Sequence, residues 1–265
     1  MRTILLTISY DGTNYCGWQR QSAKGNNCKN SALRGNVAVK TIQECIEYAL
    51  EKIHKTHISL AGSGRTDSGV HAFAQAATFI SPIDSIPAKN FVQALNAFLP
   101  QDIRIVDSKE VENNFHARFS AKKRTYKYFL DPALHPTAHD KRFSWSLYRM
   151  PNLQILNDMA NILKGELDFT TFCYAGDKSL SKCRFIEYAE FKTITDCFEN
   201  TKIVFEICAN AFLWNMVRSL VGSMVQYEKN GQDARFFKTA LEAKDRKLAG
   251  ITAPASGLFL YKVQF

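Results

Sequence analysis

The first half of the chain alternates between strand-like and helix-like spacing of its apolar residues. Up to Tyr10 apolar and polar residues alternate, a pattern typical of a β-strand with one mostly polar face. Thr41 and Glu44 have capping-box spacing, which predicts that a helix begins there. The resulting order of strand, helix, two strands, helix and strand is that of a split β-α-β arrangement. The predicted elements are a strand from Thr3 to Tyr10, a helix from Thr41 to Ile53, short strands around Leu60 and Phe79, a helix from Pro87 to Phe98, and a strand from Ile103 to Val111.

The second half repeats this order of elements in outline, without a detectable sequence repeat. We therefore expect an α+β protein with two related halves, residues 1–112 and 113–265. On the predicted helix that begins at Leu213, Arg218 lies away from the centre of the apolar stripe. An arginine in such a position is ordinarily solvated. The predicted elements are a helix from Leu153 to Leu163, strands near 184–195 and 201–209, a helix from Leu213 to Met224, and a strand from Leu258 to Phe265.

The loop between the strands around Leu60 and Phe79 concentrates candidate chemistry, with the string GSGRTDSGVHA from Gly62. Glycine permits backbone conformations that other residues avoid and lets a substrate approach the main chain, so we expect a crowded loop. Asp67 follows Arg65 by two residues, and a neighbouring positive charge favours an ionised carboxylate, which can serve as a nucleophile. The alternative is that Asp67 caps a turn beside a solvated arginine.

The composition favours an anionic partner. The chain has 265 residues, a formal net charge of +9, and 12% aromatic residues. Basic residues attract phosphates and aromatic residues stack on unpaired bases, so a nucleic acid is the expected partner. A merely soluble basic protein would have the same composition, because net charge describes nonspecific attraction and not fold.

Cysteine usage and apolar runs indicate the compartment. The seven cysteines are odd in number and show no C-x-x-C pairing, which predicts neither disulfides nor a zinc site. The chain begins directly with a strand pattern, and no apolar run reaches the roughly 18 residues that a membrane helix needs. We therefore expect a cytoplasmic protein without a signal peptide or membrane segment.

A basic and aromatic loop follows the first strand. Trp18 in this loop either stacks on a base or packs inside the protein, since tryptophan is usually highly buried. Arg20 is a candidate for binding the substrate. Residues 21–40, rich in glycine, asparagine, serine and lysine, predict a mobile basic loop.

A second basic cluster, Lys122, Lys123 and Arg124, precedes a strand in which Tyr126 and Tyr128 share a face. One interpretation is that the cluster binds phosphates and one tyrosine stacks on a base. The other interpretation is that the cluster forms a solvated turn and that the tyrosines belong to the core of the sheet. The residues alone leave both open.

The string GRTDSGVHA, from Gly64 to Ala72, resembles the GRTDAGVHA motif of the TruA family of tRNA pseudouridine synthases, with Ser68 where that family usually has alanine. Nine residues with one conservative departure are far more specific than a lone glycine-rich loop. The resemblance spans nearly the whole chain. Its further segments are Tyr10-Asp11-Gly12-Thr13, Gly17-Trp18-Gln19, Asn96 with Leu99-Pro100 and Asp102-Ile103, Phe115-His116-Ala117-Arg118-Phe119-Ser120-Ala121, and Asn215-Met216-Val217-Arg218.

The resemblance implies a fold and a partner. The expected fold has two RRM-like or ferredoxin-like halves that share an extended mixed or antiparallel sheet, with helices on one face and a central basic cleft. Members of the family act on positions 38 to 40 in the anticodon arm of tRNA, usually as homodimers. Two features depart from the family: residues 21–40 resemble an insertion, and Trp214 stands where a polar or basic residue is more usual.

The resemblance also implies a reaction in which the N1–C1′ bond of a uridine breaks, the uracil turns, and a bond to C5 forms. This isomerisation needs no metal or redox cofactor, but it needs an ionised carboxylate and a flipped nucleotide. By resemblance Asp67 is the catalytic aspartate, and Arg65 and Arg218 would hold it ionised and fill the space left by the flipped base. Tyr126 would stack on the uracil and use its hydroxyl in proton transfer at C5.

Two functions from other classes are alternatives. A nucleoside or glycoside hydrolase would also use Asp67 at a sugar carbon, but most such enzymes need a second carboxylate, and the loop contains none. An RNA-binding module without catalysis would suit two RRM-like halves. Release of free uracil would reveal the hydrolase, and full biological effect of an Asp67→Ala protein would reveal the binding module.

Overall fold

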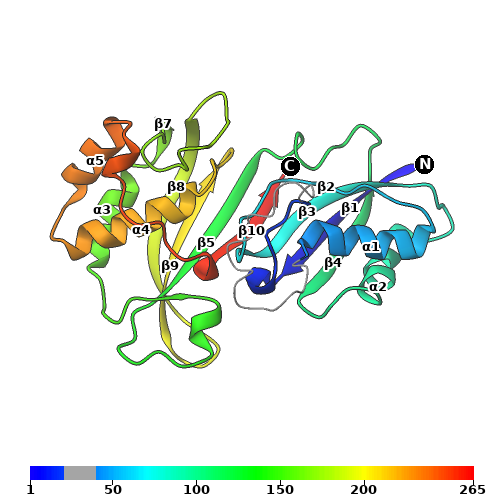
Figure 1. Cartoon of the computed structure of the whole chain (residues 1–265), viewed down its shortest axis with the longest axis horizontal. Coiled ribbons are helices and arrows are strands. Elements are labelled where there is room, and N and C mark those ends of the chain that lie inside the picture. Colours follow the sequence, from blue (N-terminus) through cyan, green and yellow to red (C-terminus); the bar gives the residue numbers. More distant parts are fainter. Residues whose placement is uncertain (21–39) are drawn as a thin grey trace. The chain divides into compact units, whose positions relative to one another are not determined.

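The computed structural model describes residues 1–20 and 40–265, which divide into two compact units (Figure 1). The first unit comprises Met1–Lys122 and Leu260–Phe265, and the second comprises Lys123–Phe259. Each unit contains strands and helices, so the predicted α+β class is confirmed.

Two predictions about the organisation of the chain stay predictions. The division into residues 1–112 and 113–265 stays a prediction, because the units are defined by contacts and not by independent folding. The mobile basic loop predicted at residues 21–40 falls, apart from Lys40, outside the described residues.

The first unit is built on a sheet with the strand order β4-β1-β3-β10. The β1 strand is antiparallel to both of its neighbours, with Ile4 opposite Phe79 on β3, and β2 adds to β3 by a short antiparallel pairing. The strand predicted up to Tyr10 is confirmed, with Ile4, Leu6 and Ile8 fully buried on one face. The opposite face is less polar in its surroundings than predicted, because Leu5 is also buried there and packs with Ala76 and Ala117. The elements are β1 (Arg2–Tyr10), η1 (Gly12–Asn14), α1 (Ile42–His54), β2 (Ala61–Gly62), β3 (His71–Ser81), η3 (Ala88–Asn90), α2 (Phe91–Asn96), β4 (Ile103–Val111) and β10 (Leu258–Gln264).

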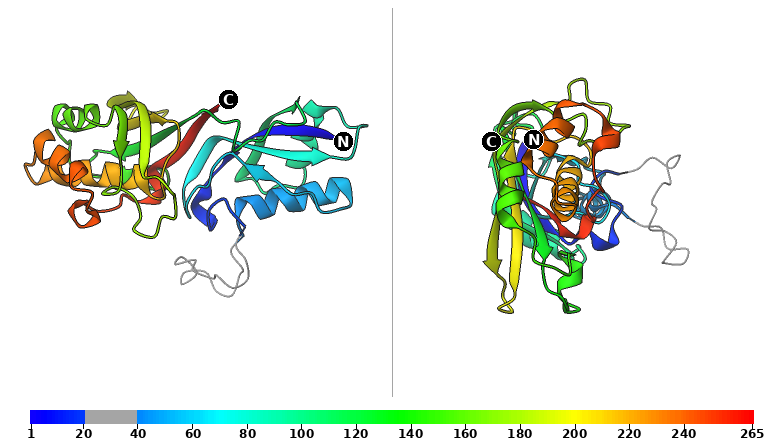
Figure 2. Two further views of the ribbon diagram at one scale, coloured as in Figure 1. Left: turned by 90° about the horizontal axis from the view of Figure 1, so that it is seen from above. Right: turned by 90° about the vertical axis from the view of Figure 1, so that its left-hand side faces the viewer.

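Helix α1 covers one face of this sheet, as the left view of Figure 2 shows. The predicted capping box is confirmed, because Thr41 accepts from the backbone N–H of Glu44 while the Glu44 carboxylate accepts from that of Thr41. At the other end, the buried His54 lies 3.1 Å from the Ser81 hydroxyl and packs edge-on against Phe79. The helix is thus fixed to the sheet at its C-terminal end.

The second unit has the strand order β5-β9-β8-β7, with all these neighbours antiparallel and β6 parallel to β5. The strands predicted near 184–195 and 201–209 are confirmed as β8 and β9. The elements are β5 (Lys123–Asp131), η4 (Asp140–Arg142), β6 (Trp145–Ser146), α3 (Leu153–Asn161), β7 (Gly165–Asp168), β8 (Cys183–Thr195), β9 (Thr201–Ala209), α4 (Met216–Lys229), α5 (Ala234–Glu242), η5 (Arg246–Leu248) and η6 (Ala255–Gly257).

The helices and strands differ from the prediction in several details. Helix α4 begins at Met216 rather than Leu213, because Asn215 has a left-handed backbone with φ of 60° and turns the chain into the helix. Helix α2 is shorter than predicted and is preceded by the 3₁₀ turn η3. Strand β5 already includes Lys123 and Arg124, which were predicted to precede it.

A buried lysine links separate segments of the second unit. The Lys202 ammonium on β9 lies 2.6 Å from a carboxylate oxygen of Asp140, 3.2 Å from one of Asp131 and 3.8 Å from one of Asp196. The Lys202 side chain is 7% exposed, and the side chains of Asp131 and Asp140 are 0% and 5% exposed. A buried charge is tolerated only when it is paired, so these carboxylates hold the η4 segment against the sheet.

The cysteines correct one expectation. Cys45, Cys173, Cys183, Cys197 and Cys208 are free thiols, but Cys16 is disulfide-bonded. The prediction of no disulfide was therefore wrong, because an odd number of cysteines does not exclude a single pair. In the described part of the chain, no helix is both long and apolar enough to cross a membrane.

Candidate active site

The loop that carries Arg65 and Asp67 connects β2 to β3 and is held by residues that follow β1. The backbone N–H of Trp18 donates to the Thr66 carbonyl at 3.1 Å, and the Ser68 hydroxyl donates to the Tyr15 carbonyl at 3.1 Å. The hydroxyls of Tyr10 and Thr66 form a buried hydrogen bond of 2.8 Å. The residues on both sides of Asp67 are therefore fixed to a second segment.

Two glycines allow this close approach. Gly17 has a φ of +86°, and a Cβ added there would lie 2.6 Å from the Thr66 carbonyl oxygen. A Cβ at Gly12 would lie 2.0 Å from the Val70 carbonyl oxygen. Only glycine fits at either position without moving the loop. The buried Trp18 ring packs against Gly62, so the packing interpretation of Trp18 is supported over base stacking.

The end of the loop is fixed by polar contacts. The buried His71 ring has its Nδ1 atom 3.1 Å from an Asp11 carboxylate oxygen and 3.1 Å from the Gly12 backbone nitrogen. Burial opposes ionisation of Asp11, but hydrogen bonds from His71 and Thr13 outweigh it and lower the pKa of the Asp11 carboxyl. Asp11 therefore stays charged near neutral pH and anchors the loop where β3 begins.

Asp67 and Arg65 differ in exposure. Asp67 is half-buried, whereas Arg65 is exposed and its Nε atom donates to the Gln19 side-chain oxygen at 3.0 Å. The loop thus carries the half-buried carboxylate of Asp67. The neighbouring guanidinium of Arg65 is directed to the Gly17-Trp18-Gln19 segment.

Tyr126 lies on β5 in the second unit and is 8% exposed. Its ring meets the Phe212 ring edge-on, with 5.0 Å between centroids. Alternation along the strand puts Arg124 on the same face as Tyr126, and the Arg124 guanidinium donates to the Asn210 carbonyl at 2.8 Å. Lys123 lies on the opposite face, where it forms a 2.8 Å ion pair with Glu187. The basic cluster is therefore divided between the two faces of the strand.

Arg218 lies in the first turn of α4 and is held by hydrogen bonds within the second unit. Its Nε atom donates to the Ala253 carbonyl at 2.7 Å, and a terminal nitrogen donates to the Asn215 side-chain oxygen at 3.1 Å. Burial raises the pKa of Tyr128, and the positive charge of Arg218 opposes that rise. Arg218 is therefore a half-buried, oriented guanidinium rather than a solvated one.

The two remaining substrate-binding candidates lie in the first unit. The Arg20 guanidinium is 3.9 Å from Glu44 and 3.8 Å from Glu47, so carboxylates offset part of its charge. Lys122 is exposed, and its backbone N–H donates to the Gln264 carbonyl at 2.8 Å. The structure thus places Asp67, Arg65, Arg20 and Lys122 in the first unit, and Tyr126, Arg218, Lys123 and Arg124 in the second.

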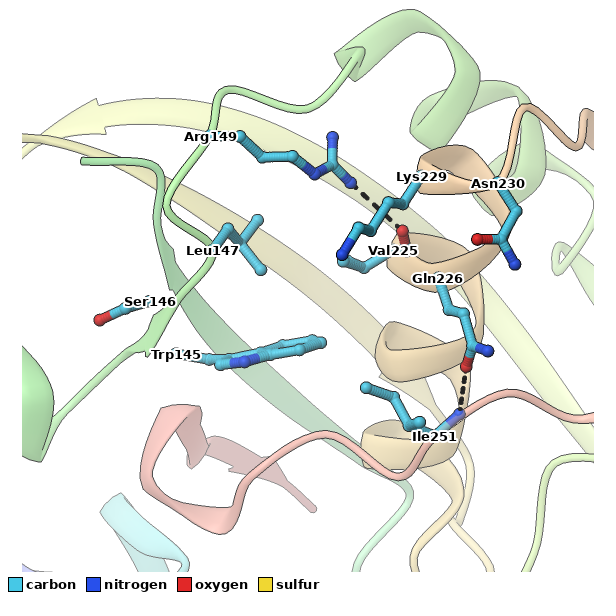
Figure 3. A pocket seen from close by; sticks show the side chains of 9 residues that line it. All are labelled: Trp145, Ser146, Leu147, Arg149, Val225, Gln226, Lys229, Asn230 and Ile251. Carbon is cyan, nitrogen blue, oxygen red and sulfur yellow. Dashed lines mark hydrogen bonds between the residues drawn. The ribbon is translucent and has the colours of Figure 1, made fainter. Parts of the chain in front are cut away.

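A pocket in the second unit contains none of these candidates. In Figure 3, Trp145 and Leu147 lie across it from residues of α4. The Gln226 side-chain oxygen accepts from the Ile251 backbone N–H at 2.7 Å, and Arg149 donates to the Val225 carbonyl. Its lining consists of Trp145, Ser146, Leu147, Arg149, Val225, Gln226, Lys229, Asn230 and Ile251.

The sequence of the chain matches those of known proteins. A family model described as tRNA pseudouridine synthase matches residues 6–120 and 159–265. The chain belongs to the tRNA pseudouridine synthase family. It is 48% identical over 264 residues to the tRNA pseudouridine synthase A of Treponema denticola, an alignment that covers 100% of this chain and 93% of the relative. It is 41% identical over 269 residues to that of Borrelia turicatae, with 99% of both chains covered.

Family membership agrees with the resemblance inferred from the motifs. The matched stretches of the tRNA pseudouridine synthase model contain the loop with Arg65 and Asp67, and the helix turn with Arg218. Tyr126 and the cluster at 122–124 fall between the stretches. The roles of all these residues stay predictions.

Sequence reasoning missed the residues that hold the site in place. Tyr10 and Gly17 were quoted for the family motif, but their contacts with Thr66 join positions far apart in sequence. Asn215 was likewise quoted without a role. A signal for it existed, because asparagine is the non-glycine residue best suited to a left-handed turn before a helix.

Proposed function

We propose that this chain is a tRNA pseudouridine synthase that converts uridines at positions 38 to 40 of the anticodon stem-loop to pseudouridine. The observation that carries the proposal is the half-buried Asp67 on a loop whose backbone is fixed on both sides, in a chain of this family. A carboxylate that must act on a flipped nucleotide needs such a fixed position, because small displacements cost rate.

Asp67 acts as the ionised carboxylate. Arg218 supplies a positive charge that two hydrogen bonds orient, and Arg65 supplies a second, more exposed one. Tyr126 presents its ring to the uracil, and its hydroxyl moves a proton at C5. Arg20, Lys122, Lys123 and Arg124 bind phosphates of the tRNA, which gives affinity without reading sequence. No metal or redox cofactor takes part.

The deciding experiment is chemical mapping of pseudouridine in an unmodified tRNA transcript after incubation with the purified protein. We expect modification at positions 38 to 40, no release of free uracil, and no change in RNA mass. Transcripts with cytidine at one, two or all three positions show which of them are substrates. Free uracil would indicate a hydrolase instead, and unmodified RNA with tight binding would indicate a binding module.

Asp67→Asn is the matched variant, because it keeps the shape of the side chain and removes its charge. We expect turnover to be abolished while tRNA binding largely survives, since many phosphate contacts supply the affinity. Turnover near the wild-type rate would remove Asp67 from the mechanism.

The proposed enzyme is a cytoplasmic homodimer that binds the anticodon arm. A net charge of +9 supports an RNA partner, as a positive surface attracts phosphates at long range. Sedimentation equilibrium over a range of protein concentrations tests the dimer.

A further inference from the structure

Two aromatic rings of the second unit pack together while both stay partly open to solvent. The centroids of Tyr174 and Trp214 are 4.3 Å apart, with the ring planes tilted by 52°. Tyr174 is 44% exposed and Trp214 is 50% exposed. Tryptophan is usually highly buried, so a half-exposed indole paired with a half-exposed phenol is a surface feature that needs an explanation.

A network of hydrogen bonds fixes the backbone that carries the two rings. The backbone N–H of Tyr174 donates to the Trp214 carbonyl at 2.9 Å, and that of Trp214 donates to an Asp177 carboxylate oxygen at 2.8 Å. Asp177 also forms a 2.7 Å ion pair with Lys182. Burial of Asp177 opposes its ionisation, but hydrogen bonds from Lys182, Trp214 and Ser179 outweigh it and lower the pKa of the carboxyl. The fixed backbone and the packing of one ring on the other preorganise the pair, which reduces the entropy lost on binding.

The pair lies beside residues of the candidate active site within the second unit. Trp214 is followed directly by Asn215, which orients Arg218. Two residues before it, Phe212 packs on Tyr126. Any ligand on the rings would thus bind along the segment that positions Arg218 and contacts the Tyr126 ring.

We propose that Trp214 and Tyr174 form a stacking platform for an unpaired base of the tRNA substrate, next to the nucleotide that is isomerised. This inference rests on the proposed function. Every base has a π-face, so rigid aromatic rings bind unpaired bases without reading their sequence. A platform of this kind suits an enzyme that accepts more than one position in a stem-loop. A net charge of +9 favours RNA over an apolar protein partner.

The test measures tRNA binding by Trp214→Ala and Tyr174→Ala in an Asp67→Asn background, so that turnover does not interfere. Each substitution should weaken binding of the tRNA transcript by about tenfold, the scale of one lost base stack. Trp214→Phe should restore most of the affinity because it keeps an aromatic face. Phe198→Ala in the same Asp67→Asn background is the matched control, because Phe198 is a 63% exposed ring at the β8–β9 turn. This control should bind the tRNA transcript with the same affinity as the parent, the Asp67→Asn protein.

A duplex RNA of equal length separates stacking from charge, because paired bases cannot stack on the rings. The Trp214→Ala protein should bind this duplex as tightly as the parent does. The indole fluorescence of the parent should fall when tRNA is added but not when the duplex is added. Equal loss for both RNAs, no loss for either, or a changed oligomeric state of the variant would each overturn the platform. These binding results stand whether or not the wild-type protein makes pseudouridine, so failure of the platform and failure of the proposed function are distinguishable.

Discussion

The side-chain oxygen of Asn215 accepts a hydrogen bond of 3.1 Å from the guanidinium of Arg218, while the backbone of Asn215 holds a left-handed conformation. Asn215 therefore both turns the chain into α4 and orients the arginine that α4 carries. The Ala253 carbonyl accepts a second bond from Arg218 at 2.7 Å. The guanidinium is thus fixed by acceptors from two segments of the chain.

The two contributions of Asn215 can be separated by substitution. Asn215→Gly keeps the left-handed turn without strain and removes only the acceptor, whereas Asn215→Ala also costs about 1–2 kcal/mol in backbone strain. We expect both variants to turn over about tenfold more slowly, because Arg218 is less well oriented. Only the alanine variant should lose thermal stability, by about 2–4 °C per kcal/mol. Single-turnover rates and melting temperatures check this, and a glycine variant with the wild-type rate would show that Ala253 alone orients Arg218.

Gly17→Ala tests whether the loop with Asp67 must be held closely. The new Cβ would lie 2.6 Å from the Thr66 carbonyl oxygen at a φ of +86°, so the loop must move. Gly231→Ala is the matched control, because Gly231 has a φ of +72° but no atom within 4 Å of its added Cβ. Both variants should lose about 1–2 kcal/mol of stability from backbone strain. Only Gly17→Ala should also lose turnover, by about 100-fold or more. Equal rates for the two variants would contradict the need for close packing.

Tyr126 combines a ring that packs on Phe212 with a hydroxyl assigned to proton transfer. Tyr126→Phe keeps the ring, so we expect near-normal tRNA binding with turnover about 100-fold slower, the scale of a lost general acid or base. Tyr126→Leu also loses the edge-on ring contact and stacking on the uracil, which should weaken capture of the flipped base by about 1–3 kcal/mol. An active phenylalanine variant together with a destabilised leucine variant would assign Tyr126 to the core and not to catalysis.

The buried Lys202 cluster gives a pH dependence with a definite sign. Burial opposes charge on both groups, but their hydrogen bonds outweigh it, so the pKa of Asp140 is lowered and that of Lys202 is raised. The contribution of Asp140 to stability is therefore present above a pH of about 4 and lost as the pH falls through its folded-state pKa. The contribution of Lys202 is present below a pH of about 10 and lost as the pH rises further.

Lys202→Met should cost about 3–5 kcal/mol at neutral pH, because it leaves buried carboxylates unpaired. This deficit should shrink as the pH is lowered toward 4, since protonation of the carboxylates relieves their repulsion. Lys238→Met is the control, as its 3.8 Å pair with Glu242 is exposed, and it should cost under about 1 kcal/mol. Denaturant unfolding at several pH values measures both, and a deficit independent of pH would contradict the electrostatic explanation.

Local sequence signals predicted the elements where local interactions decide them. The capping box at Thr41 set the start of α1, and the alternation up to Tyr10 set β1. The predicted start of α4 was wrong because Leu213 has helical spacing but the left-handed Asn215 intervenes. Helix α5 was missed, although the Asp233 side chain caps its first turn, because its apolar stripe is short.

The candidate site shows the same division between local and distant interactions. The string around Asp67 is contiguous and therefore visible in the sequence. Its anchors are not, since the Tyr10–Thr66 hydrogen bond and the packing of Gly17 against Thr66 join separate segments whose pairing no spacing rule gives. The division of Lys123 and Arg124 between two faces likewise depends on where β5 begins, which is set by pairing with β9.

The path of β10 has a consequence for synthesis of the protein on the ribosome. Residues 260–265 complete the sheet of the first unit beside β3, where Tyr261 packs on Phe73 and Phe265 on Phe115. These residues are translated after the entire second unit, so residues 1–122 are made while the edge of β3 that β10 will occupy is paired only with the two-residue strand β2. An open strand edge is prone to pairing with other chains. The nascent first unit therefore depends on residues 260–265, and chains truncated before Leu260 would keep an aggregation-prone edge.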